Sequence, residues 1–226
     1  MKSISITALM LMIGAAGIVA AEEPAKAPEP LIKMSAGSAK LLGEPMAKEF
    51  PAMTTATVFE KASAYAPDGG FTVDEAGVSA AYEAMFSGGF TKLFKWAHET
   101  GTFPSGPSFG MFYEDPGTTE PAKLTAKLGF VVSDSAKGND VVTVERIPAM
   151  TAVALSFQGS YETSNNAWEA VTKWMEANGY DWAGPGMEIY LKGAMDVADP
   201  KEYVTEIRIP VKKREVKPVE GGTPEK

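Results

Sequence analysis

Residues 147–151 read IPAMT and repeat the FPAMT of residues 50–54. Each copy leads into a run rich in β-branched and aromatic residues, 55–60 in the first case and 152–158 in the second. Such runs are typical of β-strands, and proline is tolerated at the start of a strand. The recurrence of a turn together with its strand indicates an internal duplication.

Further landmarks recur in the same order along the chain, and the first copy carries extra residues between about 67 and 90. An ordered set of matches favours two copies of one structural unit over chance similarity. The matched pairs are 95–96 with 173–174 (KW), Gly101 with Gly179, 106–107 with 184–185 (GP), and 124–132 with 203–211.

Each unit reads as strand, helix, strand, strand. In the second copy, Trp168, Val171, Trp174 and Met175 form one apolar face of a helix over 163–178. We predict an α+β fold of tandem duplicated βαββ units, in which antiparallel sheets are backed by helices around a central ligand groove. The other predicted elements are strands 141–147, 150–158, 187–192, 203–211, 108–114 and 124–132, and a helical region 73–99 that is broken at 87–89 (SGG).

The ends of the chain differ from its centre. Residues 1–21 have one lysine, an apolar core and a small-residue end, so they predict a signal peptide cleaved after Ala21; an uncleaved membrane anchor is the alternative. We expect a periplasmic or secreted protein that is a monomer. The predicted parts are a signal peptide (1–21), a Pro/Ala-rich linker (22–41), one domain (42–212, repeats 42–133 and 140–212) and a disordered tail (213–226).

The composition excludes several chemistries. The chain of 226 residues contains no cysteine and one histidine, and its net charge is −8. Thiol chemistry and cysteine-type metal sites are therefore impossible, and nucleic-acid binding lacks the cations it needs. We predict no metal site and no cofactor. His98 is predicted to complement a helix dipole, with haem ligation as the alternative.

The last strand of the second repeat carries an acid at its centre. Alternation places Thr205, Ile207 and Ile209 on the face towards the helices and Glu206 with Arg208 on the other. Glu206 is either a ligand-binding carboxylate or half of an ion pair with Arg208, and Lys127, its counterpart in the first repeat, is a second possible partner.

Aromatic residues are the other candidates for contact with a flat ligand. Tyr113 and Tyr190 lie on the middle strands of the two repeats, while Phe103 and Trp182 lie in loops near the expected groove mouth. For each of them, ordinary packing is the alternative role.

The chain resembles the GyrI-like (gyrase-inhibitor-like) effector-binding domains of bacterial transcription activators. The similarity rests on 146–149 (RIPA), on 106–107 (GP) before 112–116 (FYEDP), and on 205–210 (TEIRIP). It implies a groove that binds apolar or cationic small molecules, with a glutamate of the last strand, here Glu206, in contact with the ligand. The DNA-binding domain of the family's regulators has no counterpart here, where a signal-like segment and a Pro-rich spacer precede the module.

Three functions follow from these observations. The first is an exported small-molecule-binding protein. The second, implied by the resemblance, is a hydrolase of reactive small molecules that uses Glu206 as general base. The third is an interaction protein of the cell envelope.

Overall fold

A computed structural model describes residues 30–215. The predicted signal peptide, the first part of the predicted linker and the tail from residue 216 lie outside the described residues. Within the described part, no helix has the length and apolar character to cross a membrane.

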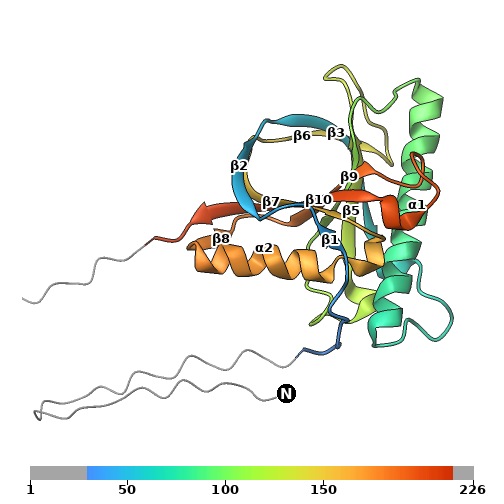
Figure 1. The fold of residues 1–226 in the computed structure, drawn as a ribbon. Coiled ribbons are helices and arrows are strands. Elements are labelled where there is room, and N and C mark those ends of the chain that lie inside the picture. The colour runs from blue at the N-terminus through green and yellow to red at the C-terminus, as the bar shows by residue number, and fades with distance from the viewer. Residues whose placement is uncertain (1–29, 216–226) are drawn as a thin grey trace, which may run out of the picture.

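Ten antiparallel strands form one bent sheet in the described residues (Figure 1). Its order is β1-β7-β10-β9-β4-β5-β3-β6, and β2 and β8 pair with β7 and β10 respectively. The α+β prediction is therefore confirmed, but the sheets expected for the two repeats are fused into one. The strands are β1 (Lys40–Leu41), β2 (Met46–Phe50), β3 (Met53–Lys61), β4 (Ser108–Phe112), β5 (Thr125–Val131), β6 (Thr143–Ile147), β7 (Met150–Gln158), β8 (Tyr180–Trp182), β9 (Gly186–Lys192) and β10 (Val204–Lys213).

The fusion occurs at β4 and β9, the equivalent strands of the two repeats. The repeat places Gly110 in register with Glu188, and these two residues are also direct partners across the β4–β9 pair. A pseudo-twofold axis therefore passes between them. The repeats also exchange strands, because β2 pairs with β7 of the second repeat and β6 pairs with β3 of the first.

The helix α1 (Glu75–Thr100) is continuous, so the predicted break at 87–89 is wrong. The side chain of Asp74 accepts a hydrogen bond from the Gly77 amide at its start, and Gly101 ends it with a positive φ of 68°. Gly89 faces the sheet, and a Cβ there would lie 2.6 Å from Cδ1 of Leu128. The glycine therefore allows close packing of α1 on the sheet and does not break the helix.

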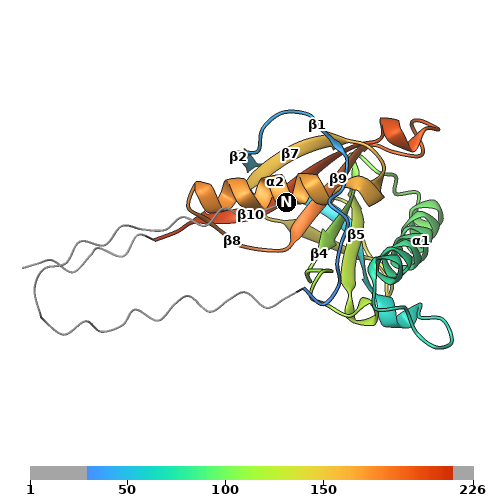
Figure 2. The ribbon, with the colours of Figure 1, turned by 60° about the horizontal axis from the view of Figure 1, so that its bottom comes forward.

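The helix α2 (Asn165–Ala177) follows a short 3-10 helix, η3 (Tyr161–Thr163). It packs on the second half of the sheet, whereas α1 packs on the first half (Figures 1 and 2). As alternation predicts, Thr205, Ile207 and Ile209 of β10 are buried on the helix side. The remaining short helices are η1 (Ala62–Ala64), η2 (Pro121–Lys123) and η4 (Pro200–Glu202).

The described part of the predicted linker is docked on the domain. The folded part of the chain therefore begins before residue 42, the expected boundary. Ile32 is buried, its amide donates to the Gly117 carbonyl, and residues 40–41 form β1. Buried apolar side chains and paired backbone groups hold this segment in place despite its Pro/Ala-rich composition. At the other end, β10 continues to Lys213, the first residue of the predicted tail.

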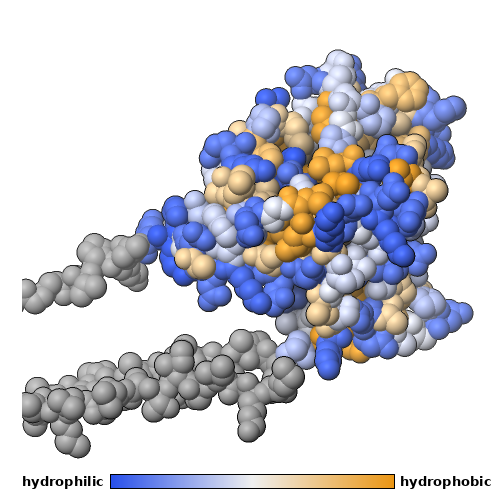
Figure 3. Space-filling view, in the orientation of Figure 1, coloured by the Kyte–Doolittle hydropathy of each residue, from blue (hydrophilic) through white to orange (hydrophobic). Residues whose placement is uncertain are grey.

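One face of the molecule is partly apolar. Figure 3 shows apolar atoms gathered near its centre, over the strands labelled β1, β9 and β10 in Figure 1. Leu41, Leu42 and Leu191 are among the exposed apolar side chains of the described residues.

Candidate functional site

A row of cross-strand partners crosses the helix side of the sheet and contains one acid. Its apolar members lie under α2 at one end and under α1 at the other, and Glu188 occupies the centre opposite Gly110. A carboxylate at the centre of an apolar row costs free energy unless a partner or a ligand compensates it. The row is Leu155, Ile207, Glu188, Gly110, Leu128 and Val58.

Glu188 is only 6% exposed and is held by neutral donors. The indole Nε1 of Trp168 donates to Oε1 over 2.9 Å, and the Tyr190 hydroxyl donates to Oε2 over a longer 3.4 Å. Among residues 30–215, no salt bridge includes Glu188. The site therefore holds a carboxylate without a compensating positive charge from the described chain.

Burial raises the pKa of Glu188 to about 7, and hydrogen bonds from Trp168, Tyr190 and Ser164 lower it only in part. Burial also raises the pKa values of two neighbouring tyrosines, that of Tyr161 to about 12 and that of Tyr190 well above its ordinary value. The phenols are therefore neutral near pH 7, while the carboxyl group is divided between its two forms.

Aromatic rings from both helices and from the sheet surround this carboxylate, and we call them the aromatic cluster. Ring centroids lie 6.1 Å apart for Phe86 and Tyr190 and 6.0 Å apart for Phe112 and Trp168. Both contacts are edge-on, which is a favourable geometry of aromatic pairs. The cluster consists of Tyr82 and Phe86 of α1, Phe112 of β4, Tyr161 of η3, Trp168 of α2, Tyr190 of β9, and Tyr203.

Two glycines allow the rings to lie directly on the sheet. A Cβ at Gly110 would lie 3.0 Å from both Cζ of Phe86 and the Tyr190 hydroxyl oxygen. A Cβ at Gly186 would lie 2.7 Å from Cη2 of Trp168. The missing side chains of the central strands are therefore replaced by aromatic side chains from the helices.

Of the residues predicted from the sequence, Tyr190 lies in the aromatic cluster and Trp182 lies at its edge. A Cβ at Gly186 would approach the rings of both Trp168 and Trp182, and Trp182 is 48% exposed. Tyr113 lies elsewhere, where it meets Phe59 edge-on with centroids 5.6 Å apart. Ligand contact by Tyr190, Trp182 and Tyr113 stays a prediction.

Glu206 lies on the opposite face of the sheet, away from the aromatic cluster. Its carboxylate pairs with Nε of Arg208 over 2.6 Å, which is the first of the two ion pairs considered from the sequence. Lys127 instead pairs with Glu145 over 2.8 Å. Lys127 and Glu206 therefore do not neutralise each other, and the face that carries them is distinct from the one that carries Glu188.

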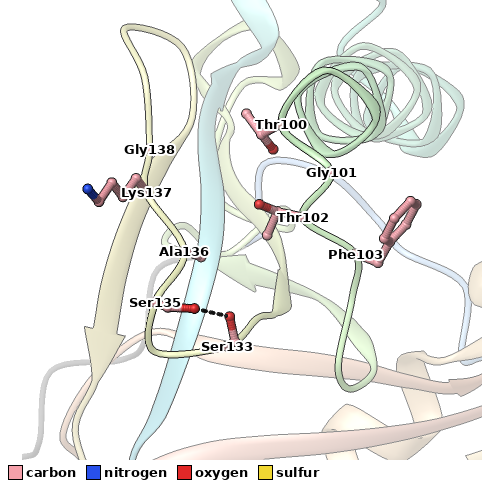
Figure 4. Close-up of a pocket in the computed structure, with 9 residues that line it drawn as sticks. All are labelled: Thr100, Gly101, Thr102, Phe103, Ser133, Ser135, Ala136, Lys137 and Gly138. Atoms are coloured by element: carbon pink, nitrogen blue, oxygen red, sulfur yellow. Dashed lines mark hydrogen bonds between the residues drawn. The ribbon is translucent and has the colours of Figure 1, made fainter.

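Phe103 is 71% exposed and lies at a surface pocket of about 510 Å³ at the end of α1. Figure 4 shows that the side chains of Phe103 and Lys137 point away from each other on opposite sides of this pocket. The hydroxyl groups of Ser133 and Ser135 point towards each other and are hydrogen-bonded. A second pocket, of about 270 Å³, lies beside Trp182 at the end of α2. Neither pocket includes Glu188.

Sequence reasoning missed Glu188 and the helical members of the aromatic cluster. The signal that could have found Glu188 is the one applied to Glu206, an acid in the middle of an apolar strand. Tyr82, Phe86 and Trp168 all meet Phe112, and this arrangement depends on how both helices pack, which no local pattern shows.

The fold and the buried, aromatic-walled carboxylate define a small-molecule-binding domain of α+β architecture. The chain belongs to the GyrI-like small-molecule-binding domain family, whose sequence pattern matches residues 77–212. That description agrees with the first of the three functions expected from the sequence, small-molecule binding.

Several solved structures have a similar fold. The crystal structure of the EcmrR C-terminal domain matches with a TM-score of 0.57 and 22% identity. The match covers 76% of this chain and 99% of the EcmrR domain. EcmrR in its cryo-EM structure with DNA has a TM-score of 0.59 and 21% identity. The match covers 75% of this chain and 57% of the EcmrR chain. An uncharacterized conserved protein from Listeria innocua has a TM-score of 0.52 and 16% identity over 75% and 92% of the two chains. At these identities the likeness is one of fold.

Proposed function

We propose that the protein binds a lipophilic organic cation between α1 and α2, in contact with the carboxylate of Glu188. The observation that carries this proposal is the buried Glu188, which has neutral hydrogen-bond donors and no cationic partner among the described residues. A bound cation would supply the missing positive charge, and its apolar body would replace water on the rings.

The aromatic cluster closes over Glu188, so a ligand must displace rings to reach the carboxylate. Tyr161 is 40% exposed, and Tyr82, Phe86, Phe112 and Trp168 are only half-buried. Rotation of exposed and half-buried side chains is fast compared with binding. The proposed site therefore opens without a change in the sheet, and one chain supplies every group it needs, which is consistent with a monomer.

The proposal is tested by calorimetric titration with ethidium, a flat cation, and with phenanthridine, its neutral core. We expect Glu188→Gln to weaken ethidium binding about tenfold or more at pH 8, because a charge-assisted contact is lost. Phenanthridine binding should change little, because the neutral ring system gains nothing from the carboxylate's charge.

The matched control is Glu206→Gln, which makes the same chemical change on the opposite face of the sheet. This variant should bind ethidium as the unmodified protein does. A loss of affinity in Glu206→Gln with no loss in Glu188→Gln would contradict the proposal and favour the residue predicted from the sequence.

We further propose that binding takes place outside the cytoplasm. The support is the sequence of residues 1–21, with its lysine, apolar core and small-residue end. A mature N-terminus at Glu22 in protein recovered from the exported fraction is the expected result. Recovery of the full chain from the cytoplasm alone would contradict export.

A further inference from the structure

Residues 32–39, which we call the strap, connect two buried anchors on the surface of the domain. The anchors are Ile32, which is 2% exposed, and Ala39, which is 6% exposed. Between them lie mostly small, exposed residues, and Gly37 has a φ of 73° that favours glycine. The strap is therefore fixed at its ends, and its middle rests on the domain through the half-buried Met34 and Gly37.

One residue of the strap contacts the starts of both helices. The amide and the hydroxyl of Ser35 donate to Oε1 of Glu75 in α1 over 2.9 and 2.7 Å. The side-chain amide of Asn165, in α2, donates to the Ser35 carbonyl oxygen over 2.8 Å. Figures 1 and 2 both show the segment before β1 running between α2 and α1.

The same end of α2 approaches Glu188. The hydroxyl of Ser164 helps to lower the pKa of the Glu188 carboxyl group, and Trp168 donates to it from the first turn of the helix. Gly37 lies against the backbone on both sides of Ser164, since a Cβ there would be 2.6 Å from the Thr163 carbonyl oxygen and 2.9 Å from the Asn165 amide. The strap thus bridges the starts of both helices, beside the residues of α2 that hold Glu188.

We infer that the strap gates the Glu188 site: its middle leaves the helices to admit a ligand and closes behind it, which limits both entry and ligand size. This inference rests on the proposed function. The hydrogen bonds of Ser35 that tie the middle to the helices are exposed and contribute little net stability each, whereas the anchors are buried. Met34, which packs against the core under α1, and Ser38, which donates to the Thr163 carbonyl, add the remaining contacts of the middle. Opening between the anchors therefore costs less than detaching the whole segment.

The chain has no cysteine, so a cysteine pair can lock the strap. We would combine Ser35→Cys with Asn165→Cys, whose parent residues are in contact, and measure ethidium association by stopped-flow fluorescence before and after reduction. The oxidised protein should associate about tenfold more slowly than the reduced protein, because only the open fraction is competent.

The complementary variant, Glu75→Ala with Asn165→Ala, removes the polar contacts without cross-linking. It should associate about tenfold faster than the unmodified protein, and its affinity for the bulkier tetraphenylphosphonium should rise relative to that for ethidium. Glu99→Gln, at the other end of α1, is the control and should change neither the association rate nor the relative affinity for the two cations. If the cysteine pair does not oxidise, the Glu75→Ala, Asn165→Ala variant tests the gate by itself.

Equal association rates in the locked and reduced proteins, or in the loosened and unmodified proteins, would overturn the gate while leaving the proposed function intact. Failure of the unmodified protein to bind either cation would overturn the proposed function itself.

Discussion

Glu188 and Gly110 occupy equivalent positions in the two repeats and are paired across the centre of the sheet. The duplication therefore places one acid and one residue without a side chain about the pseudo-twofold axis. The ring of Phe86 of α1 and the hydroxyl group of Tyr190 of β9 come close to Gly110. Because only one of the two equivalent positions carries an acid, the centre of the sheet has a single carboxylate, which lies between the two helices.

At the scale of this residue, stability should depend on pH. The pKa of Glu188 is raised from 4.5 to about 7 by burial, so the folded protein retains a proton that the unfolded chain releases between these values. Stability therefore falls as the pH rises through this window, and the loss is complete above pH 7. Between pH 5 and pH 8, the free energy of unfolding should fall by roughly 2–3 kcal/mol more in the unmodified protein than in Glu188→Gln. Urea unfolding at both pH values measures this difference, and equal pH dependence would contradict it.

Ligand affinity should have the opposite pH dependence. A cation binds the ionised form of Glu188, and the ionised fraction increases between pH 6 and pH 8. Ethidium should therefore bind about tenfold more tightly at pH 8 than at pH 6, with release of protons in calorimetry. Glu188→Gln should abolish this dependence, and a dependence that survives the substitution would assign it to another group.

At the scale of elements, α1 shows how close packing overrides a local signal. Two adjacent glycines in a helix lower its intrinsic stability, and they predicted a break. In the structure Gly89 is buried against Leu128 of β5, and the helix continues. Packing on the sheet thus compensates for the low helix propensity of the pair.

Gly89→Ala should therefore destabilise the protein, although alanine is the better helix former. The added methyl group would lie 2.6 Å from Cδ1 of the buried Leu128, and overpacking costs about 1–3 kcal/mol. Ser87→Ala, at an exposed position of the same turn, is the control and should leave stability within about 0.5 kcal/mol. A Gly89→Ala protein as stable as Ser87→Ala in urea would show that the helix is not constrained there.

At the scale of the whole molecule, the two repeats form one cooperative unit. They share the β4–β9 pair and exchange strands through β2 and β6, so neither half of the sheet is complete alone. Phe109 lies at the shared pair, opposite Ile189, and is fully buried.

Phe109→Ala should lower the free energy of unfolding by about 3–5 kcal/mol and affect both repeats together. The transitions followed by tryptophan fluorescence and by far-UV circular dichroism should coincide, as for a two-state protein. Phe103→Ala, at an exposed site, should have little effect. Two separate transitions would contradict a single unit.

The sequence by itself determined the duplication, the α+β class and the two faces of each strand, because recurring turns, apolar spacing and alternation are local properties. Alternation placed Ile207 towards the helices and Glu206 away from them, as the structure has it. It did not distinguish Glu206 from Glu188, since both are acids in the middle of apolar strands.

Only the tertiary structure decided which acid is enclosed. The β4–β9 register places Glu188 opposite Gly110, and helix packing then brings Trp168 of one repeat and Phe86 of the other to the same place. Residues 32–41 have the composition of a linker, but in the structure they are docked through contacts with residues far along the chain. Burial and long-range pairing are properties of the assembled chain, and they fixed the position of this acid.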